Sequence, residues 1–196
     1  MPTTFNIPCV ILCGGRSSRM GEDKSLLPFD HSNSLTQYQY DRLKPYFKEL
    51  YISSKINKFD FLEDESSLIL DEGEVFSPLV ALDTIIKKFE NQKIFIITVD
   101  TPLVSIDTIN KIINSSNDYD ITVAQTERIH NLCGVFSSSI RNSITKMLSN
   151  DIHKVGYLLK QNNTNIIKLP ENGEFINLND KDEYNKALKI ISLTNN

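Results

Sequence analysis

Long apolar runs are missing from the sequence, and none approaches the roughly 18 residues that a membrane-spanning helix needs. Residues 1–8 have neither the basic flank nor the apolar stretch of a secretory signal peptide. Internal repeats and low-complexity tracts are absent as well. These absences predict a cytoplasmic protein with no membrane partner.

An excess of basic residues is also missing: 21 Lys and Arg stand against 25 Asp and Glu, giving a formal net charge of −4. Proteins that hold nucleic acid through many phosphate contacts are usually basic, so the composition argues against a DNA or RNA partner. A small anionic ligand is still compatible with this charge, because a local cluster of donors can bind it.

Cysteine is scarce, and Cys9, Cys13 and Cys133 form an odd number without the paired spacing of a metal site. Residues 10–12 have the character of a strand interior, so we expect buried free thiols. The chain is 40% hydrophobic and 23% charged, which is ordinary for a globular protein. Its 196 residues suit a single domain covering residues 1–196.

Apolar runs alternate with helical patterns along the first half of the chain. The predicted strands are residues 8–13, 50–53, 68–70 and 93–99, and the predicted helices are residues 35–47 and 77–90. Ser77 followed by Pro78 is a typical helix start, with a capping hydroxyl and proline at the first helical position. A strand-then-helix order predicts a mainly parallel sheet with helices on both faces.

The second half is more mixed. Strands predicted at residues 119–124 and 132–136 are too close for a helical crossover, so we expect antiparallel pairing there. Helices are predicted at residues 138–148 and 151–159, and Asn179 is the expected cap of a last helix. The predicted fold class is α/β, a Rossmann-like three-layer sandwich whose sheet is mixed but mainly parallel.

The most informative segment is the loop after the first strand, where residues 12–24 have the sequence LCGGRSSRMGEDK. Ligands of open α/β sheets bind just outside the carboxyl ends of the strands, where this loop must lie. Glycines let the backbone approach a ligand closely, and successive N–H groups can form an anion-binding nest. Arg16, Arg19 and Lys24 add positive charge. The segment therefore predicts a phosphate-binding loop.

This loop lacks the Gly-Lys-Ser/Thr ending of a Walker loop, and its adjacent Gly14 and Gly15 do not fit the dinucleotide fingerprint. The pattern L-x-G-G-x-S-x-R-M-G-x-D-K instead resembles the signature of the molybdenum cofactor guanylyltransferases. The resemblance covers nearly the whole chain and implies transfer of GMP from GTP to molybdopterin, with Mg²⁺ as cofactor and pyrophosphate released. Relatives in the wider nucleotidyltransferase superfamily often have Ala-Gly at the doublet, which favours guanine here.

Two predicted strands end in an aspartate, Asp71 and Asp100, so both carboxylates should lie at the same edge of the sheet as the loop. Mg²⁺ bound to phosphates typically takes only one or two protein carboxylates. The resemblance implies that Asp100 binds the metal and Asp71 contacts the nucleotide. The alternative is that both are turn residues that accept backbone N–H bonds.

The resemblance implies three further sets of residues. The GTP-binding set is Leu12, Cys13, Gly14, Gly15, Lys24, Asp71 and Asp100; the catalytic set is Lys24, Arg19 and Asp100; the acceptor-side set is Asn177 and Asn179. His130 lies in a stretch that also resembles the acceptor side, although a lone histidine in a short connection is commonly structural. The acceptor phosphate is already anionic, so no strong general base is expected.

Two positions depart from the family pattern: Ser77 stands where glycine is usual, and Lys55 follows the strand near which an asparagine usually contacts the nucleotide. The alternatives are a related transferase that uses CTP or a sugar or polyol phosphate, and a non-catalytic nucleotide sensor. The resemblance also implies protein partners that deliver the cofactor or mature molybdoenzymes.

Overall fold

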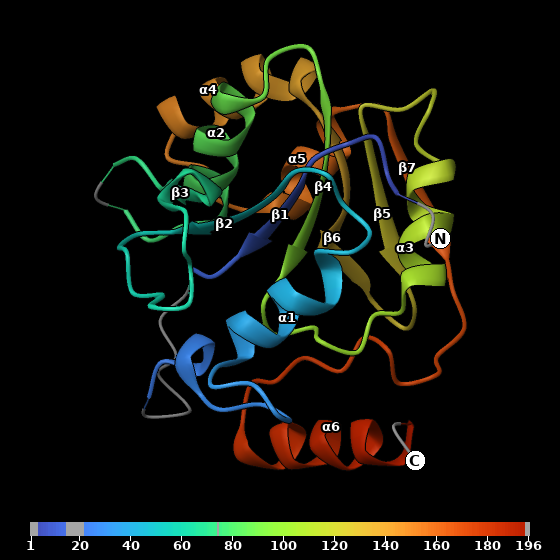
Figure 1. Cartoon of the computed structure of the whole chain (residues 1–196). Helices are drawn as coiled ribbons and strands as arrows, with labels where there is room; N and C mark the ends of the chain where they lie inside the picture. The colour runs from blue at the N-terminus through green and yellow to red at the C-terminus, as the bar shows by residue number, and fades with distance from the viewer. Residues whose placement is uncertain (1–3, 15–21, 74, 195–196) are drawn as a thin grey trace.

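The computed structural model describes residues 4–14, 22–73 and 75–194. Within these residues the chain forms one seven-stranded sheet of order β3-β2-β1-β4-β6-β5-β7 (Figure 1). The strands are β1 (Cys9–Leu12), β2 (Leu50–Ser54), β3 (Leu68–Leu70), β4 (Lys93–Thr98), β5 (Ile121–Gln125), β6 (Ile129–Ser137) and β7 (Thr164–Lys168). Strand β6 pairs antiparallel with both of its neighbours, and every other pairing is parallel. The mainly parallel, mixed sheet is confirmed.

Helices cover both faces of the sheet (Figure 1). They are α1 (Leu35–Leu43), α2 (Pro78–Lys88), α3 (Ile106–Asn114), α4 (Arg141–Ser149), α5 (Val155–Gln161) and α6 (Lys181–Thr194). Because side chains alternate along a strand, Val10 of β1 packs with α2, α4 and α5, whereas Ile11 packs with α1, α3 and α6. The three-layer arrangement is therefore confirmed. No helix in the described ranges is long and apolar enough to span a membrane.

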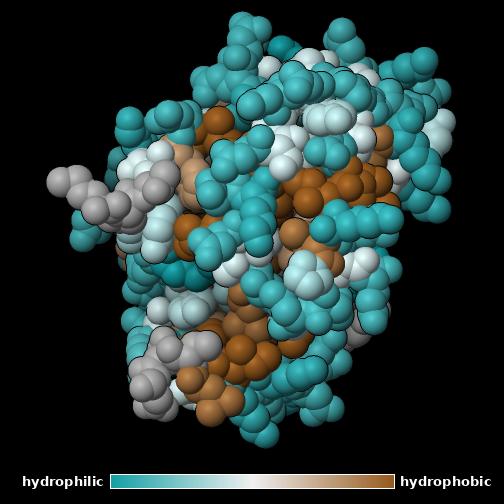
Figure 2. All heavy atoms as spheres, turned by 90° about the vertical axis from the view of Figure 1, so that its right-hand side faces the viewer, coloured by the Kyte–Doolittle hydropathy of each residue, from teal (hydrophilic) through white to brown (hydrophobic). Residues whose placement is uncertain are grey.

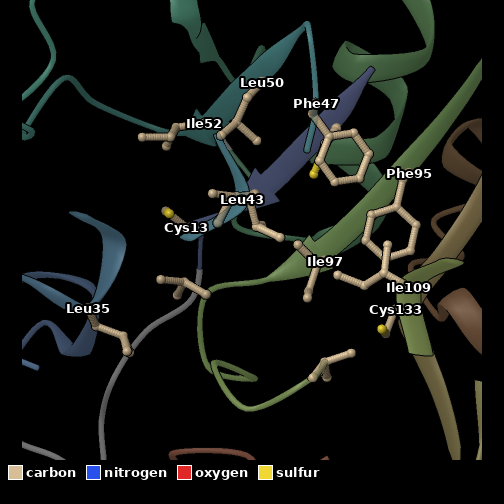
Figure 3. Packing of buried hydrophobic residues seen from close by; sticks show 14 of the residues in the cluster. Cys13, Leu35, Leu43, Phe47, Leu50, Ile52, Phe95, Ile97, Ile109 and Cys133 are labelled. Carbon is tan, nitrogen blue, oxygen red and sulfur yellow. The ribbon is translucent and has the colours of Figure 1, made fainter. Parts of the chain in front are cut away.

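The three cysteines are free and buried in this sheet and its flanking core. Figure 3 shows Cys13 and Cys133 among the apolar side chains of the α1 side, which include Phe47 and Phe95. Burial raises the pKa of the Cys13 and Cys133 thiols to about 12. All three thiols are thus packing groups, as the sequence predicts.

Among the strands and α-helices of the described residues, α3 and β7 were not predicted from the sequence. Helix α3 has clear local signals, because the Ser105 hydroxyl accepts the Thr108 N–H at 3.2 Å and Ile109 and Ile112 are buried. Strand β7 is a short edge strand in which no residue is buried, and Figure 2 shows that this side of the molecule is mostly hydrophilic with some hydrophobic patches. Its sequence therefore carries little of the apolar alternation that marks a strand.

The predicted cap of the last helix is wrong by one residue. The Asp180 carboxylate accepts the Glu183 N–H at 2.9 Å, which is the geometry of a helix N-cap. The Asn179 N–H instead donates to the Glu183 carboxylate at 2.9 Å. Asn179 therefore precedes the cap, and the capping pair is Asp180 with Glu183.

Candidate active site

The carboxyl ends of the parallel strands bring the predicted site residues to one edge of the sheet. Leu12 at the end of β1 lies in register with Ser53 of β2 and Thr98 of β4. Asp71 follows β3 directly, and Asp100 lies in the turn that follows β4. The sheet therefore places both aspartates at the edge where the glycine-rich loop begins.

Lys24 and Asp100 form an ion pair at this edge, with the Lys24 Nζ 2.6 Å from the Asp100 Oδ2. Their side chains are 19% and 17% exposed, so the pair is largely shielded but open to a ligand. Lys24 begins a short 3-10 helix, and the Asp23 carboxylate caps it by accepting the Ser25 N–H at 3.1 Å. The local fold thus holds the end of the loop against the turn that follows β4.

The Asp71 carboxylate faces the start of the loop. The Ser53 hydroxyl donates to its Oδ1 at 2.5 Å, and its Oδ2 would lie 3.8 Å from a Cβ placed on Gly14. Burial raises the pKa of Asp71, although the Ser53 hydrogen bond and the charge of Lys55 act in the opposite direction. Asp71 is therefore a partly desolvated acceptor directed at the loop.

A pocket of about 540 Å³ opens beside Asp71. It is lined by Leu12, Gly14, Lys55, Asp71, Val75, Phe76, Ser77, Pro78, Ala81, Thr98 and Leu132. This volume is within the range of about 300–1,000 Å³ that small-molecule sites occupy. Most of the lining is apolar, with one carboxylate and one ammonium group, which suits a flat ring system carrying a few polar atoms.

The outer wall of the pocket was not predicted from the sequence. Val75 and Phe76 line it and are 53% and 57% exposed, just before the start of α2. The signal that could have indicated them is an apolar pair in an otherwise polar loop. Residues of this kind beside a binding site commonly contact the ligand.

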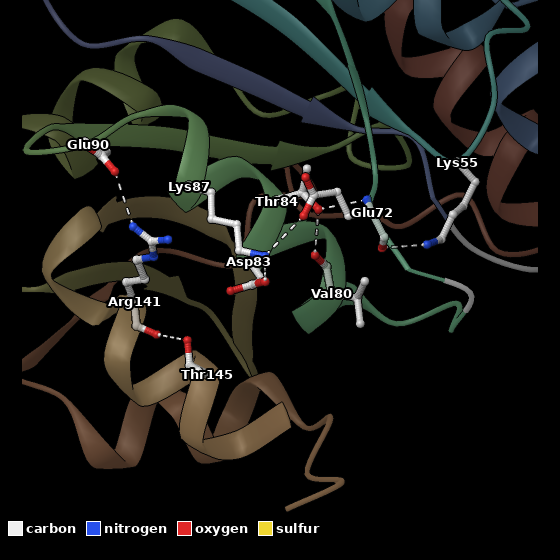
Figure 4. Close-up of polar contacts among 9 residues, drawn as sticks. All are labelled: Lys55, Glu72, Val80, Asp83, Thr84, Lys87, Glu90, Arg141 and Thr145. Carbon is white, nitrogen blue, oxygen red and sulfur yellow. Dashed lines mark hydrogen bonds and ion pairs between the residues drawn. The ribbon is translucent and has the colours of Figure 1, made fainter. Parts of the chain in front are cut away.

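Lys55 fixes this wall to the sheet. Its ammonium group donates to the carbonyls of Glu72 and Gly73 at 3.1 and 2.6 Å, as Figure 4 shows in part. Glu72 is itself bound to α2, because its N–H donates to the Thr84 hydroxyl at 3.0 Å and its carboxylate pairs with Lys87 at 3.1 Å (Figure 4). Lys55, which departs from the family pattern, therefore binds the segment after β3 beside the pocket.

Ser77, where the family usually has glycine, also has a structural role. Its hydroxyl accepts the Leu79 N–H at 3.2 Å, so it caps α2 as predicted. The same oxygen lies 3.0 Å from His153 Nδ1, and His153 Nε2 lies 3.0 Å from the Asp151 carboxylate. Ser77 thus links the pocket to the segment before α5.

The acceptor-side segment meets Asp100. The Leu178 N–H donates to the Asp100 carbonyl at 2.9 Å, which brings Asn177 and Asn179 to the same edge. The Asn177 Oδ1 is buried without a hydrogen-bond partner among the described residues. A buried polar atom of this kind is a candidate ligand contact, because unpaired burial is costly.

His130 lies in a packed position. Its ring stacks on Phe175 with centroids 4.2 Å apart, and its Nε2 lies 2.9 Å from the Thr126 hydroxyl. Burial lowers the pKa of His130, and the charge of Arg128 adds to this effect. A neutral, stacked imidazole matches the structural interpretation of this residue.

The remaining predicted residues differ in their placement. Cys13 is buried, with its Sγ 3.6 Å from the Thr36 hydroxyl, and it does not line the pocket. Gly15 and Arg19 lie outside the described residues.

A divalent cation at this edge would depend on few protein ligands. No group of three or more His, Cys, Asp and Glu side chains able to hold a metal occurs in the described part of the chain. Asp100 is a hard oxygen donor beside the loop, and Mg²⁺ bound to nucleotide phosphates is typically held by one or two carboxylates. The residues present therefore fit a metal that arrives with phosphate oxygens.

The Lys24–Asp100 pair and the pocket lined by Gly14 and Asp71 lie at one edge of the sheet, an arrangement that suits a nucleoside with its phosphates. Nucleotidyltransferases are the class of protein that this arrangement suggests. Residues 9–165 match the family model described as "MobA-like NTP transferase domain", and the chain belongs to this family.

A curated relative agrees with this membership, and two solved structures share the fold. A molybdenum cofactor guanylyltransferase of Campylobacter jejuni (strain RM1221) is 40% identical over 182 residues, which are 91% of this chain and 93% of that protein. A solved structure from Aquifex aeolicus VF5 is 29% identical with a TM-score of 0.72, covering 87% of this chain and 91% of that one. The molybdopterin-guanine dinucleotide biosynthesis protein A of Archaeoglobus fulgidus shares the fold, with a TM-score of 0.75 at 15% identity over 95% of this chain and 99% of that one.

Proposed function

We propose that the protein transfers GMP from GTP to molybdopterin, releasing pyrophosphate and forming the guanine dinucleotide form of the cofactor. The observation that carries the proposal is the Lys24–Asp100 pair, 2.6 Å apart at the edge where the loop and the nucleoside-sized pocket meet. Identity of 40% to a protein named as a molybdenum cofactor guanylyltransferase supports the choice of base and acceptor.

In this proposal the nucleoside occupies the pocket. Leu12, Ala81 and Leu132 offer apolar surface to the base, and Asp71 offers a carboxylate oxygen to the donors of the nucleoside. The triphosphate then lies between Gly14 and Lys24, and the sequence pattern of the segment between them predicts phosphate binding by backbone N–H groups and basic side chains.

Asp100 would hold Mg²⁺, which supplies charge neutralisation along the triphosphate when bound. Lys24 stabilises the charge that develops on the departing pyrophosphate, and Arg19 adds to this stabilisation. The acceptor phosphate enters on the side of Asn177, next to Asp100, and attacks the α-phosphorus in line. Because that phosphate is already anionic, positioning rather than proton removal is the main task of the protein.

Two alternatives predict different ligands or no turnover. A related transferase would use CTP, or a sugar or polyol phosphate acceptor, on the same edge of the sheet. A non-catalytic nucleotide sensor would bind the triphosphate without transferring it. The Lys24–Asp100 pair argues against a sensor, because binding alone does not need both groups.

The experiment is a thermal-shift screen with ATP, CTP, GTP and UTP, each with and without Mg²⁺. We expect GTP with Mg²⁺ to stabilise the protein most, by about 2.7 kcal/mol at roughly 100 times its Kd. A larger shift with CTP would assign the protein to a cytidylyl branch. Pyrophosphate release on addition of molybdopterin then separates the enzyme from a sensor, which would bind GTP and release none.

A further inference from the structure

The inner face of α1 carries polar side chains where a helix against a sheet normally carries apolar ones. Thr36 and Gln39 are fully buried, and the Nη2 atom of Arg42 is buried as well. The three residues follow one another at three-residue spacing, so they form one stripe along the helix. Burying polar groups is costly unless they are hydrogen-bonded, so their partners indicate what the stripe holds.

Gln39 holds the turn that carries Asp100. Its Nε2 donates to the carbonyls of Thr98 and Thr101, at 3.2 and 3.3 Å. These two residues bracket Asp100 in the chain, and the Thr101 N–H also donates to the Thr98 carbonyl at 3.3 Å. The side-chain amide therefore binds the backbone on both sides of the aspartate.

Arg42 fixes the orientation of that amide. Its Nε donates to the Gln39 Oε1 at 2.5 Å, and its Nη1 donates to the Val104 carbonyl at 2.9 Å. A guanidinium group can only donate, so the atom it contacts must be the amide oxygen. The amide nitrogen must then face the two turn carbonyls, which can only accept. The Gln39 amide nitrogen and the Nε and Nη1 of Arg42 thus meet acceptors, whereas the Arg42 Nη2 is buried without a hydrogen-bond partner among the described residues. These contacts allow one orientation of the amide.

Thr36 binds the segment that carries Lys24, the other residue of the ion pair. Its hydroxyl donates to the carbonyl of Ser25, the residue after Lys24, at 2.8 Å. One helical turn of α1 therefore separates the group that holds the Lys24 segment from the group that holds the Asp100 turn. The spacing between the two segments follows from the rigid rise of a helix.

We propose that Gln39 is a positioning residue for Asp100: its amide, oriented by Arg42, sets the Asp100 carboxylate where the metal-bound triphosphate needs it. The inference rests on the proposed function, in which Asp100 holds the metal.

The test compares Gln39→Met with Ser116→Ala. Methionine has nearly the length of glutamine but cannot donate to the turn. Ser116 is a matched control, because it is buried and its hydroxyl donates to one backbone carbonyl, that of Ile113 at 2.7 Å, after the end of α3 and away from Asp100. Three quantities are measured: Mn²⁺ affinity with GTP present, the Mg²⁺ concentration at half-maximal rate, and kcat.

We expect Gln39→Met to weaken Mn²⁺ binding, raise the half-maximal Mg²⁺ concentration and lower kcat by about 10- to 100-fold, the cost of a misplacement near 1 Å. Ser116→Ala should lower the melting temperature and leave all three quantities at wild-type values. In an Asp100→Asn background, Gln39→Met should lower the rate no further, because both changes act through the same carboxylate.

Wild-type metal dependence and kcat in Gln39→Met would overturn the proposal and leave Gln39 as a structural residue. If Gln39→Met does not fold, Gln39→Glu replaces it, because a carboxylate keeps the contact with Arg42 and places oxygen against the turn carbonyls. We expect the same three changes in that variant, and their absence would be equally decisive. A wild-type protein that transfers no GMP would contradict the proposed function, while the Mn²⁺ titration would still decide the role of Gln39.

Discussion

At the scale of single residues, Asp71 places a carboxylate that can bind a ligand at a position where burial disfavours its ionised form. The carboxylate is partly buried, and burial raises its pKa despite the Ser53 hydroxyl and the charge of Lys55. A group with a raised folded-state pKa destabilises the fold when it is ionised. Such a cost is expected at a binding site, where a ligand supplies the missing partners.

Asp71→Asn should therefore raise the melting temperature of the unliganded protein at neutral pH. The wild-type cost is fully present above the folded-state pKa and disappears as the pH falls to the ordinary value of 3.8, so the gain should shrink on acidification. The introduced amide would keep an acceptor oxygen for the Ser53 hydroxyl. Melting curves at several pH values, without nucleotide, measure the effect.

The exposed Asp60 provides the control, because Asp60→Asn removes a charge of the same kind without relieving burial. It should leave the melting temperature nearly unchanged. If Asp71→Asn were less stable than wild type at neutral pH, the Ser53 hydrogen bond would outweigh the cost of burial.

Individual residues of the site could be predicted to the extent that they lie at strand ends or in the loop pattern. Lys24 and Asp100 are 76 positions apart, and the sequence indicates both, but only the fold shows their contact. Gln39 could not be predicted, because a glutamine on a helix is ordinarily solvated. Its function depends on contacts with a turn far along the chain, which no local pattern encodes.

At the scale of elements, β6 has little room between its two antiparallel neighbours. It lies between β4 and β5, and its pairing with β5 shifts register between Val123 and Ala124. A Cβ on Gly134 would lie 2.1 Å from the Thr122 carbonyl oxygen and 2.9 Å from the Val123 Cγ1. Only glycine allows the strands to approach so closely at this irregularity.

Gly134→Ala should lower the free energy of unfolding by about 3 kcal/mol or more, since the clash is with backbone in a buried sheet. Gly156→Ala is the matched control. Its Cβ would meet nothing closer than the Asn131 side chain at 3.9 Å, and alanine should stabilise α5 by about 0.5–1 kcal/mol. Urea unfolding measures both variants. A decrease in the free energy of unfolding below about 1 kcal/mol for Gly134→Ala would show that β5 and β6 can move apart at little cost in stability.

Most elements with strong periodicity were predicted, although the amphipathic helix α3 was missed, and β7, which is defined by its surroundings, was not predicted. The apolar run of β4 indicates a strand covered on both faces, and the structure confirms it. Strand β7 exists because β5 offers it a parallel edge, with Val123 in register with Ile166. The shift of the cap from Asn179 to Asp180 has a similar origin, because both residues are good caps and the entry direction of the chain selects one.

At the scale of the whole molecule, the two cores share every central strand. Val10 and Ile96 face one core, and Ile11 and Ile97 face the other. Neither core can lose its strands without exposing the other. We therefore predict that the described elements unfold as a single domain in one transition, with equal calorimetric and van't Hoff enthalpies. Scanning calorimetry, with helix content followed in parallel by circular dichroism, measures this. Two resolved transitions, or early loss of α6 alone, would contradict it.

The order of strands in the sheet also determines when each strand can pair with its neighbours during synthesis. Strand β1 pairs with β2 on one side and with β4 on the other. Cys9 therefore cannot pair with Phe95 until residue 95 has left the ribosome. At about 5–20 residues per second, the most apolar early segment stays without one of its neighbours for several seconds. During that interval its open edge is a target for chaperones and for other nascent chains. The central position of β1, which in the finished fold brings Leu12 into register with Thr98, thus leaves one edge of the strand unpaired until β4 has been synthesised.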